Sequence, residues 1–394
     1  MFWAPLALLG AFAYWQLLAR SAALPPDYRE GSNDLSIYRD AGEAILRGHI
    51  PYRDFFIEYP PGSLPAFVPP ALFSVDKAGY ISLFASEMAL VLVAALVLTA
   101  LAARRLWGFR AWPAPALTFV AAAIMLYPVA VTRYDAIVAL TLAVATFCAA
   151  LGGRHVYLAY ASLGLGAAAK LVPALATVPL ARRGYARGYA IFFGVLALFF
   201  VPALLLGGGS FLSSFAYHTE RGLQVESLAA SILMKLGWVR GISFEYGAFE
   251  VQGRGVELAS SLSLPLTGCL LLISALVMYR HHRLRELDAR QFPRYAAALI
   301  LAFMLGSKVL SPQYMIWLLP LVPLGAEGLL AVGLSLIFLA ACWTTTQVFP
   351  IHYGDLLTAR YPGPDLLLAR NLLLVLLWAL LLLLPPNTPQ KETL

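Results

Sequence analysis

The chain has 394 residues, of which 60% are hydrophobic and 12% charged, and its formal net charge is +7. A soluble domain carries about 25% charged residues, so this composition excludes a soluble globular protein and indicates a polytopic membrane protein. The cysteines, Cys148, Cys269 and Cys342, lie inside apolar runs and form no CxxC pair, which favours packing roles over a disulfide framework or a metal site.

Twelve hydrophobic spans are predicted, several of them short for a membrane crossing. The first apolar run has no basic segment before it, so it is predicted to remain as a helix and not to be cleaved as a signal peptide. With the N-terminus in the cytoplasm, the inner loops carry 13 basic and four acidic residues, in agreement with the positive-inside rule. The predicted spans are roughly 2–20, 78–103, 112–130, 134–151, 156–169, 171–181, 188–207, 258–279, 294–306, 314–324, 327–346 and 365–385.

The first predicted outer loop, 21–77, is rich in charged residues. Between Leu35 and Leu46 the apolar residues recur at helical spacing, which predicts an amphipathic helix with Asn33 or Asp34 near its N-cap. The apolar piece 63–75 is too short to cross a membrane and is predicted to be an interfacial helix. Acids and arginines between apolar segments indicate a polar site held at a membrane face.

Two lysines interrupt pairs of short apolar spans. Lys170 separates 156–169 from 171–181, and Lys308 lies in a similar break. Irregular backbone at membrane depth is tolerated where it lines a cavity, so a hollow with both lysines at its floor is predicted. Because lysine binds phosphate as a point charge, we expect a phosphate site there. The alternative is that each lysine extends to the outer interface.

The second predicted outer loop, 208–257, contains an amphipathic piece from Leu228 to Trp238. In the same loop, His218 and Arg221 are a candidate pair for binding phosphate or sugar, with ordinary loop polarity as the alternative. Asp135 follows a predicted helix junction, where it could cap the next helix or contact substrate.

Asp34 is the main catalytic candidate. A carboxylate in a sheltered outer pocket could accept the proton of a sugar hydroxyl as that oxygen attacks. Its reference pKa of about 3.9 suits proton transfer late in the step. The alternative is a plain N-cap of the helix that follows. Asp40 faces another side of that helix, while Asp54 and Glu58 could pair with Arg53 or position a substrate.

Residues 164–169 match the GxGxxA pattern of dinucleotide-binding proteins. No strand precedes them and they lie inside an apolar span, so the pattern predicts close helix packing instead. No Walker loop, HExxH or GxSxG motif is present.

An ordered set of motifs resembles a known superfamily over nearly the whole chain. The motifs are NDLSIYRDAG, PYRDFFIEYPPG, RYDAIVAL, GAAAKLVPALATVPLA, YHTERGLQVES and SKVLSPQYMIWLLP. This pattern is similar to that of the GT-C superfamily of integral-membrane glycosyltransferases, and especially its DUF2029-type group, which includes mannosyltransferases that use polyprenyl-phosphate mannose.

The resemblance implies an all-α, GT-C-like membrane domain over 1–394, with about 12 transmembrane helices and two sizeable outer loops. It implies Asp34 as the general base. The residues expected to bind the donor phosphate are Lys170, Lys308, Arg221 and His218. Those expected to contact substrate are Tyr38, Asp54, Glu58, Tyr59, Arg133, Asp135, Glu226, Gln313 and Tyr314.

The expected reaction is the transfer of one sugar, with mannose as the expected identity, from a polyprenyl-phosphate donor to a lipid or glycan acceptor. It would invert the anomeric centre on the outer face of a bacterial inner membrane, with no metal indicated and no nucleic-acid partner. A secondary transporter or flippase is the alternative, since broken helices suit it equally well. The polar residues gather in two outer loops without an internal repeat, which favours the transferase. A non-catalytic assembly partner would leave the charged first loop unexplained.

Overall fold

The computed structural model describes residues 2–24, 33–181, 185–284 and 289–384, with positions 33, 215–219, 283 and 284 described by their backbone only. The helices of eight residues or more are α1 (Trp3–Ala22), α3 (Asn33–Leu46), α5 (Lys77–Trp107), α6 (Pro113–Met125), α8 (Asp135–Leu151), α9 (His155–Ala169), α10 (Ala186–Glu220), α11 (Leu228–Lys235), α12 (Val256–Leu284), α13 (Phe292–Gly306), α14 (Gly328–Thr346) and α16 (Gly363–Leu383). The shorter elements are η1 (Pro61–Ala66), α4 (Val68–Phe73), α7 (Tyr127–Ala130), η2 (Val172–Leu180), η3 (Ala289–Gln291), η4 (Pro312–Leu318), η5 (Val322–Leu324), η6 (Gln347–Ile351) and α15 (Tyr353–Leu357).

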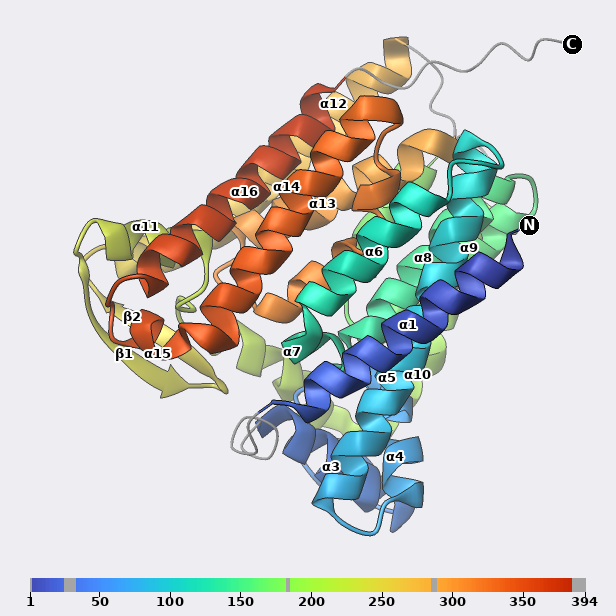
Figure 1. The fold of residues 1–394 in the computed structure, drawn as a ribbon. Coiled ribbons are helices and arrows are strands. Elements are labelled where there is room, and N and C mark those ends of the chain that lie inside the picture. Colours follow the sequence, from blue (N-terminus) through green and yellow to red (C-terminus); the bar gives the residue numbers. More distant parts are fainter. Residues whose placement is uncertain (1, 25–32, 182–184, 285–288, 385–394) are drawn as a thin grey trace, which may run out of the picture.

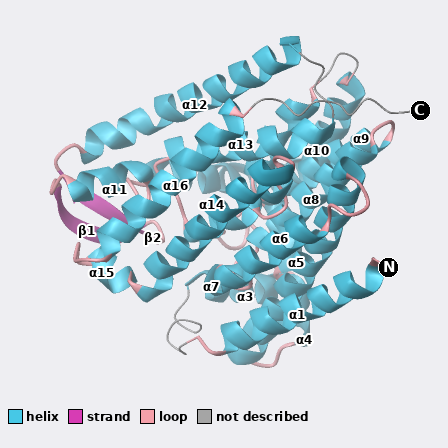
Figure 2. Ribbon diagram, turned by 45° about the horizontal axis from the view of Figure 1, so that its top comes forward, coloured by secondary structure: helices cyan, strands magenta, loops and turns pink. Residues whose placement is uncertain are grey.

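The long helices lie side by side in one bundle (Figure 1). Helices α3 and α4 lie at the bottom of Figure 1, and α11, α15 and the two strands lie together at the left of Figures 1 and 2. Five described segments are long and apolar enough to cross a membrane: Lys77–Trp107, Ala186–Ser214, Val256–His282, Gly328–Ile351 and Gly363–Leu383. This agrees with a multi-pass membrane protein, while the count of 12 crossings stays a prediction.

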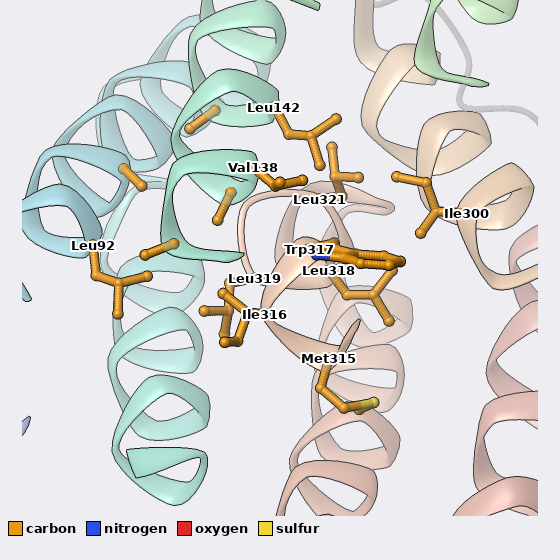
Figure 3. Close-up of a cluster of buried hydrophobic side chains, with 14 of the residues drawn as sticks. Leu92, Val138, Leu142, Ile300, Met315, Ile316, Trp317, Leu318, Leu319 and Leu321 are labelled. Carbon is orange, nitrogen blue, oxygen red and sulfur yellow. The ribbon is translucent and has the colours of Figure 1, made fainter. Parts of the chain in front are cut away.

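The predicted span 314–324 is not a regular helix. It forms η4 and η5, and Trp317 and its neighbours there are fully buried. In Figure 3, Trp317 lies among Val138 and Leu142 of α8 and Ile300 of α13. A segment enclosed in this way packs against protein and not lipid, which explains how it tolerates irregular backbone.

The predicted break at Lys170 is present. Helix α9 ends at Ala169, Lys170 is extended, and the chain continues as the 3₁₀ segment η2 and not as the predicted short helix 171–181. Pro173, at the start of η2, has no N–H for a continuing helix, and a residue before proline is biased away from helical geometry.

The first loop contains the predicted helix. Helix α3 covers 33–46 and buries Leu35, Tyr38 and Ala41 on one face. The prediction of a single helix over 63–75 was wrong, because two short elements, η1 and α4, occupy this stretch. A Cβ at Gly42 would lie 2.2 Å from the carbonyl oxygen of Phe67, so glycine allows α3 to approach the start of α4 closely.

Helix α10 extends beyond the predicted span 188–207, with a break where that span was predicted to end. Helix α10 continues past 208 to Glu220, with a non-helical break at Gly208 (φ 52°, ψ −128°) that glycine accommodates. The predicted amphipathic piece from Leu228 to Trp238 contains helix α11. After it come two antiparallel strands, β1 (Val239–Glu245) and β2 (Ala248–Gly253), which the sequence reading had not anticipated.

The GxGxxA stretch serves packing, as predicted. A Cβ at Gly166 would lie 2.4 Å from Thr141 Oγ1 of α8, and one at Gly164 would lie 2.9 Å from the carbonyl oxygen of Phe192 in α10. Small residues thus let α9 approach both neighbouring helices closely.

Candidate active site

A cavity of about 790 Å³ lies between the two loops and the breaks after α9 and α13. Of the residues predicted to form the site, those that line it are Asp34, Glu58, Tyr59, Arg133, Lys170, Arg221, Glu226, Lys308, Gln313 and Tyr314. Segments far apart in the sequence therefore meet at one concave surface, as expected of a small-molecule site.

Asp34 lies in the first turn of α3 with both carboxylate oxygens engaged. Tyr59 Oη donates to Oδ1 at 2.6 Å, and Arg133 Nη2 lies 2.8 Å from Oδ2. The Asp34 side chain is 31% exposed, so it remains accessible from the cavity. An ionised carboxylate has about four lone-pair sites, and two bonds leave capacity for a further donor such as a substrate hydroxyl.

The position of Tyr59 depends on a close backbone approach. A Cβ at Gly62 would lie 2.4 Å from the carbonyl carbon of Ala168, so only glycine lets η1 reach the end of α9. Tyr38 lies behind the site, with its ring stacked on Phe67 at 4.4 Å and edge-on to Tyr59 at 5.2 Å. Tyr38 is buried and does not line the cavity, so it supports Tyr59 by packing.

Lys170 is held by a buried carboxylate. Its Nζ donates to Asp135 Oδ1 at 2.8 Å, and Trp317 Nε1 donates to the same oxygen at 2.6 Å. The rings of Tyr134, Tyr314 and Trp317 have centroids 5.1–5.2 Å from the ammonium, within cation–π range. Asp135, which is 1% exposed, therefore pairs with a lysine and does not cap α8. An ammonium has three donors, so Lys170 can make further bonds toward the cavity that it lines.

A second cationic group lies where the two loops meet. Arg221 Nη2 is 2.9 Å from Glu58 Oε2, an ion pair between residues 163 positions apart. Lys308 Nζ donates to the main-chain oxygen of Arg221. Burial raises the pKa of Glu58, and the Arg221 guanidinium opposes this shift. The pair ties the first loop to the end of α10 across the cavity.

Glu226 is the most deeply buried acid of the cavity wall, at 2% exposed. Its Oε2 accepts from Gln224 Nε2 at 3.2 Å, whereas Oε1 has no hydrogen-bond partner among the described residues. Burial raises the pKa of Glu226 to about 7, and the nearby charge of Arg370 opposes the shift. Arg370 itself, in α16, donates to the main-chain oxygen of Glu226 at 2.7 Å.

Besides Tyr38 and Asp135, which lie behind the cavity lining, Asp54 is a predicted site residue that does not line the cavity. Asp54 lies outside it, where it pairs with Arg53 at 2.8 Å and accepts from the N–H of Ile50 at 2.7 Å. The side chain of His218 lies outside the described residues. Asp40 is exposed, as expected.

Sequence reasoning missed three residues of the site: Trp317, Gln224 and Arg370. Arg370 carried a usable signal, because a charged residue inside an apolar helix is a default candidate for function. Trp317 and Gln224 carried none, since their bonds depend on partners 182 and 87 positions away. Among the described residues, no group of three or more His, Cys, Asp or Glu is placed to hold a metal ion.

The family model of glycosyltransferase family 87 matches residues 56–312. That range includes Glu58, Arg133, Lys170 and Glu226, while Asp34 lies before it. No curated protein matches the sequence.

Two solved structures resemble the fold. ArnT from Cupriavidus metallidurans bound to undecaprenyl phosphate matches with 15% identity and a TM-score of 0.53, and the match covers 97% of this chain and 77% of that chain. The apo form of the same protein matches with 14% identity and a TM-score of 0.47, and that match covers 89% of this chain and 72% of that chain. At this identity the first match shows a shared fold.

Proposed function

Because this chain belongs to glycosyltransferase family 87, we propose that it transfers a single sugar, with mannose as the expected one, from a polyprenyl-phosphate donor to a lipid or glycan acceptor. A lipid-linked donor is supported by the ArnT fold, whose solved form holds undecaprenyl phosphate, and by the cations of the cavity. The acceptor hydroxyl attacks the anomeric carbon, and the bond from that carbon to the phosphate oxygen breaks.

Asp34 acts as the general base in this proposal. Its carboxylate accepts the proton of the acceptor hydroxyl as the new glycosidic bond forms, while Tyr59 and Arg133 hold the carboxylate in place. Polyprenyl phosphate leaves as an anion and needs no proton, so a single base suffices. Attack from the face opposite the leaving phosphate inverts the anomeric centre.

The donor phosphate binds beside Lys170, Lys308 and Arg221. All three line the cavity, and charge-assisted bonds from ammonium and guanidinium groups are the usual means of holding phosphate. Lys170 is paired with Asp135, so it contributes a directed donor more than a net positive charge. Gln313 and Tyr314 line the same cavity and contact the sugar in this proposal.

The cavity opens on the extracytoplasmic side of a bacterial inner membrane in this proposal. The basic inner loops of the positive-inside arrangement support that orientation. A cysteine placed at Gly247, which lines the cavity, should react with an impermeant reagent in intact cells, and one at His282 should not. Reaction of the cysteine at position 282 with none at position 247 would show that the chain has the opposite orientation in the membrane.

The observation that carries the proposal is Asp34, accessible from a cavity that is also lined by Lys170, Lys308 and Arg221. The test uses purified protein in lipid, incubated with radiolabelled polyprenyl-phosphate mannose and a membrane-lipid extract. Label should move to an extracted lipid or glycan. Equal transfer from other polyprenyl-phosphate sugars would remove the preference for mannose, and no transfer from any of them would contradict the lipid-linked donor.

A further inference from the structure

Glu226 is a buried carboxyl of the cavity that the reaction above leaves unused. It lies between α10 and α11, is 2% exposed, and lines the same cavity as Asp34. Gln224 Nε2 donates to one of its oxygens, and the other has no hydrogen-bond partner among the described residues. Burying an acceptor without a partner is costly, so such a group in a cavity wall calls for an explanation.

The main chain around Glu226 is fixed by α16. Arg370 donates to the carbonyl oxygen of Glu226 at 2.7 Å, and Asn371 donates to Ser231 Oγ at 3.0 Å and to the carbonyl oxygen of Ser227 at 3.3 Å. The backbone is therefore held while the carboxyl keeps an unused oxygen. The terminal torsion of a glutamate is broad and roughly two-fold, so a small rotation decides which oxygen meets a ligand.

The chemistry of this part of the wall suits a hydroxyl and not a phosphate. A carboxylate repels a phosphate of the same sign, whereas it accepts strongly from an O–H donor. The Gln224 amide, 3.2 Å from the carboxyl, is hydrogen-bonded to Ser311 Oγ and through Oε1 to the N–H of Leu310, so its position is fixed. The rings of Tyr314 and Trp317, stacked at 4.0 Å, add an apolar surface to the same cavity.

We propose that Glu226 is a specificity-determining residue, whose carboxyl accepts a hydrogen bond from a sugar hydroxyl of a substrate bound in the cavity. This inference rests on the proposed glycosyl transfer. The hydroxyl belongs to the donor sugar or to the sugar of the acceptor. A site built to bond a hydroxyl discriminates strongly against an analogue that lacks it, because the buried partner is then left unpaired.

The test compares the wild type with Glu226→Gln and Glu226→Asp. At pH 8, above the raised pKa of Glu226, Gln keeps the shape but loses the charge, and Asp keeps the charge but withdraws the carboxyl by one methylene. Binding is measured with polyprenyl-phosphate mannose and with polyprenyl phosphate lacking the sugar, and transfer is measured over a range of membrane-lipid extract. Thermal unfolding is recorded on the same samples.

If Glu226 holds the donor sugar, both variants should bind polyprenyl-phosphate mannose about tenfold to a hundredfold more weakly, while binding of polyprenyl phosphate stays unchanged. If it holds the acceptor sugar, donor binding should be unchanged and the extract concentration for half-maximal transfer should rise by a similar factor. In the donor case, a monodeoxy donor that lacks the contacted hydroxyl should be affected little by either variant.

Glu250 provides the matched control. It is also buried, at 7% exposed, but its carboxylate accepts from the N–H of Gly222 at 2.7 Å and does not line the cavity. Glu250→Gln should lower the temperature of thermal unfolding, and because Glu250 lies near Lys308, any effect on donor binding should be equal with and without the sugar. If the Glu226 variants change thermal unfolding but neither the preference for the sugar-bearing donor nor the extract requirement, while the wild type transfers label, the inference is wrong and the proposed function stands. If the wild type transfers no label, the proposed function itself fails.

Discussion

Asp34 and Glu226 are two carboxyls of one cavity with opposite surroundings. Asp34 is 31% exposed and has both oxygens engaged, one by Tyr59 and one by an arginine. Glu226 is 2% exposed with one oxygen unused, and its arginine, Arg370, bonds the main chain and not the carboxyl. The two carboxyls thus differ in what the neighbouring arginine bonds: the carboxylate itself at Asp34, and the main chain at Glu226. This difference suits Asp34 to proton transfer and Glu226 to the recognition of a hydroxyl.

The largest expected effect is that of Asp34→Asn. The amide keeps the shape but cannot accept the proton, so turnover should fall by about 10²-fold to 10⁴-fold, the usual contribution of a general base. Binding of polyprenyl-phosphate mannose should stay near the wild-type value, because the change removes no group assigned to the donor phosphate. Initial rates and donor affinity are measured on the same sample.

Asp40→Asn is the matched control for that variant. Asp40 lies on the same helix but is exposed, so transfer should be nearly unchanged. Near-full activity of Asp34→Asn, or an equal loss of activity in Asp40→Asn, would contradict the role of Asp34 as the general base.

Asp135 sharpens the comparison, because it is as buried as Glu226 but engaged by Lys170 and Trp317. Lys170→Met should weaken donor binding and also destabilise the protein by about 3–5 kcal/mol, the usual cost of leaving a buried charge without its partner. The loss of stability is expected because Lys170 is the ion-pair partner of the buried Asp135. Thermal unfolding in detergent measures it.

The double variant Lys170→Met/Asp135→Asn separates the two effects. Removing both charges should restore most of the thermal stability, since Asn can still accept from Trp317, while donor binding stays weak. Normal donor binding in both variants would leave Lys170 a purely structural residue.

The raised pKa of Glu226 predicts a pH dependence of stability. The unfolded chain releases this proton near the ordinary value of 4.5, and the folded protein holds it up to about 7. Stability from this group is therefore present at low pH and is lost as the pH rises toward 7, by about 3 kcal/mol in all. Glu226→Gln, which mimics the protonated form, should match the wild type at pH 5 and unfold at a higher temperature at pH 8. If the difference in unfolding temperature between Glu226→Gln and the wild type does not vary with pH, the raised pKa of Glu226 is contradicted.

Asp54→Asn should have the smallest effect. Its partner Arg53 is 53% exposed, and surface ion pairs contribute about 0–1 kcal/mol. Transfer kinetics should be unchanged, because Asp54 lies outside the cavity. A clear rise in the half-saturating concentration of either substrate would restore Asp54 to the substrate-binding set that the sequence predicted.

Local patterns in the sequence predicted the local structure well. The helical spacing after Asn33 gave α3, and the membrane class followed from the scarcity of charge. The ordered motifs pointed to a GT-C glycosyltransferase in preference to a transporter, and the match to glycosyltransferase family 87 and the ArnT-like fold bear this out. The irregular η4 was misread as a regular span, because hydropathy reports how apolar a segment is and not whether it faces lipid or protein.

The sequence by itself determined which residues the site could use. The charged groups in two loops and two chain breaks had few places to lie except a shared polar cavity, because burying a charge in lipid is costly. Only the tertiary structure decided their partners. Lys170 and Asp135 are 35 positions apart, Trp317 and Asp135 are 182 apart, and Arg370 reaches Glu226 over 144. Such pairs follow from how α8, α9, η4 and α16 pack, and helix packing depends on surfaces from the whole chain. The carboxyl of Glu226 kept a free oxygen for the same physical reason, since packing placed Arg370 against its backbone.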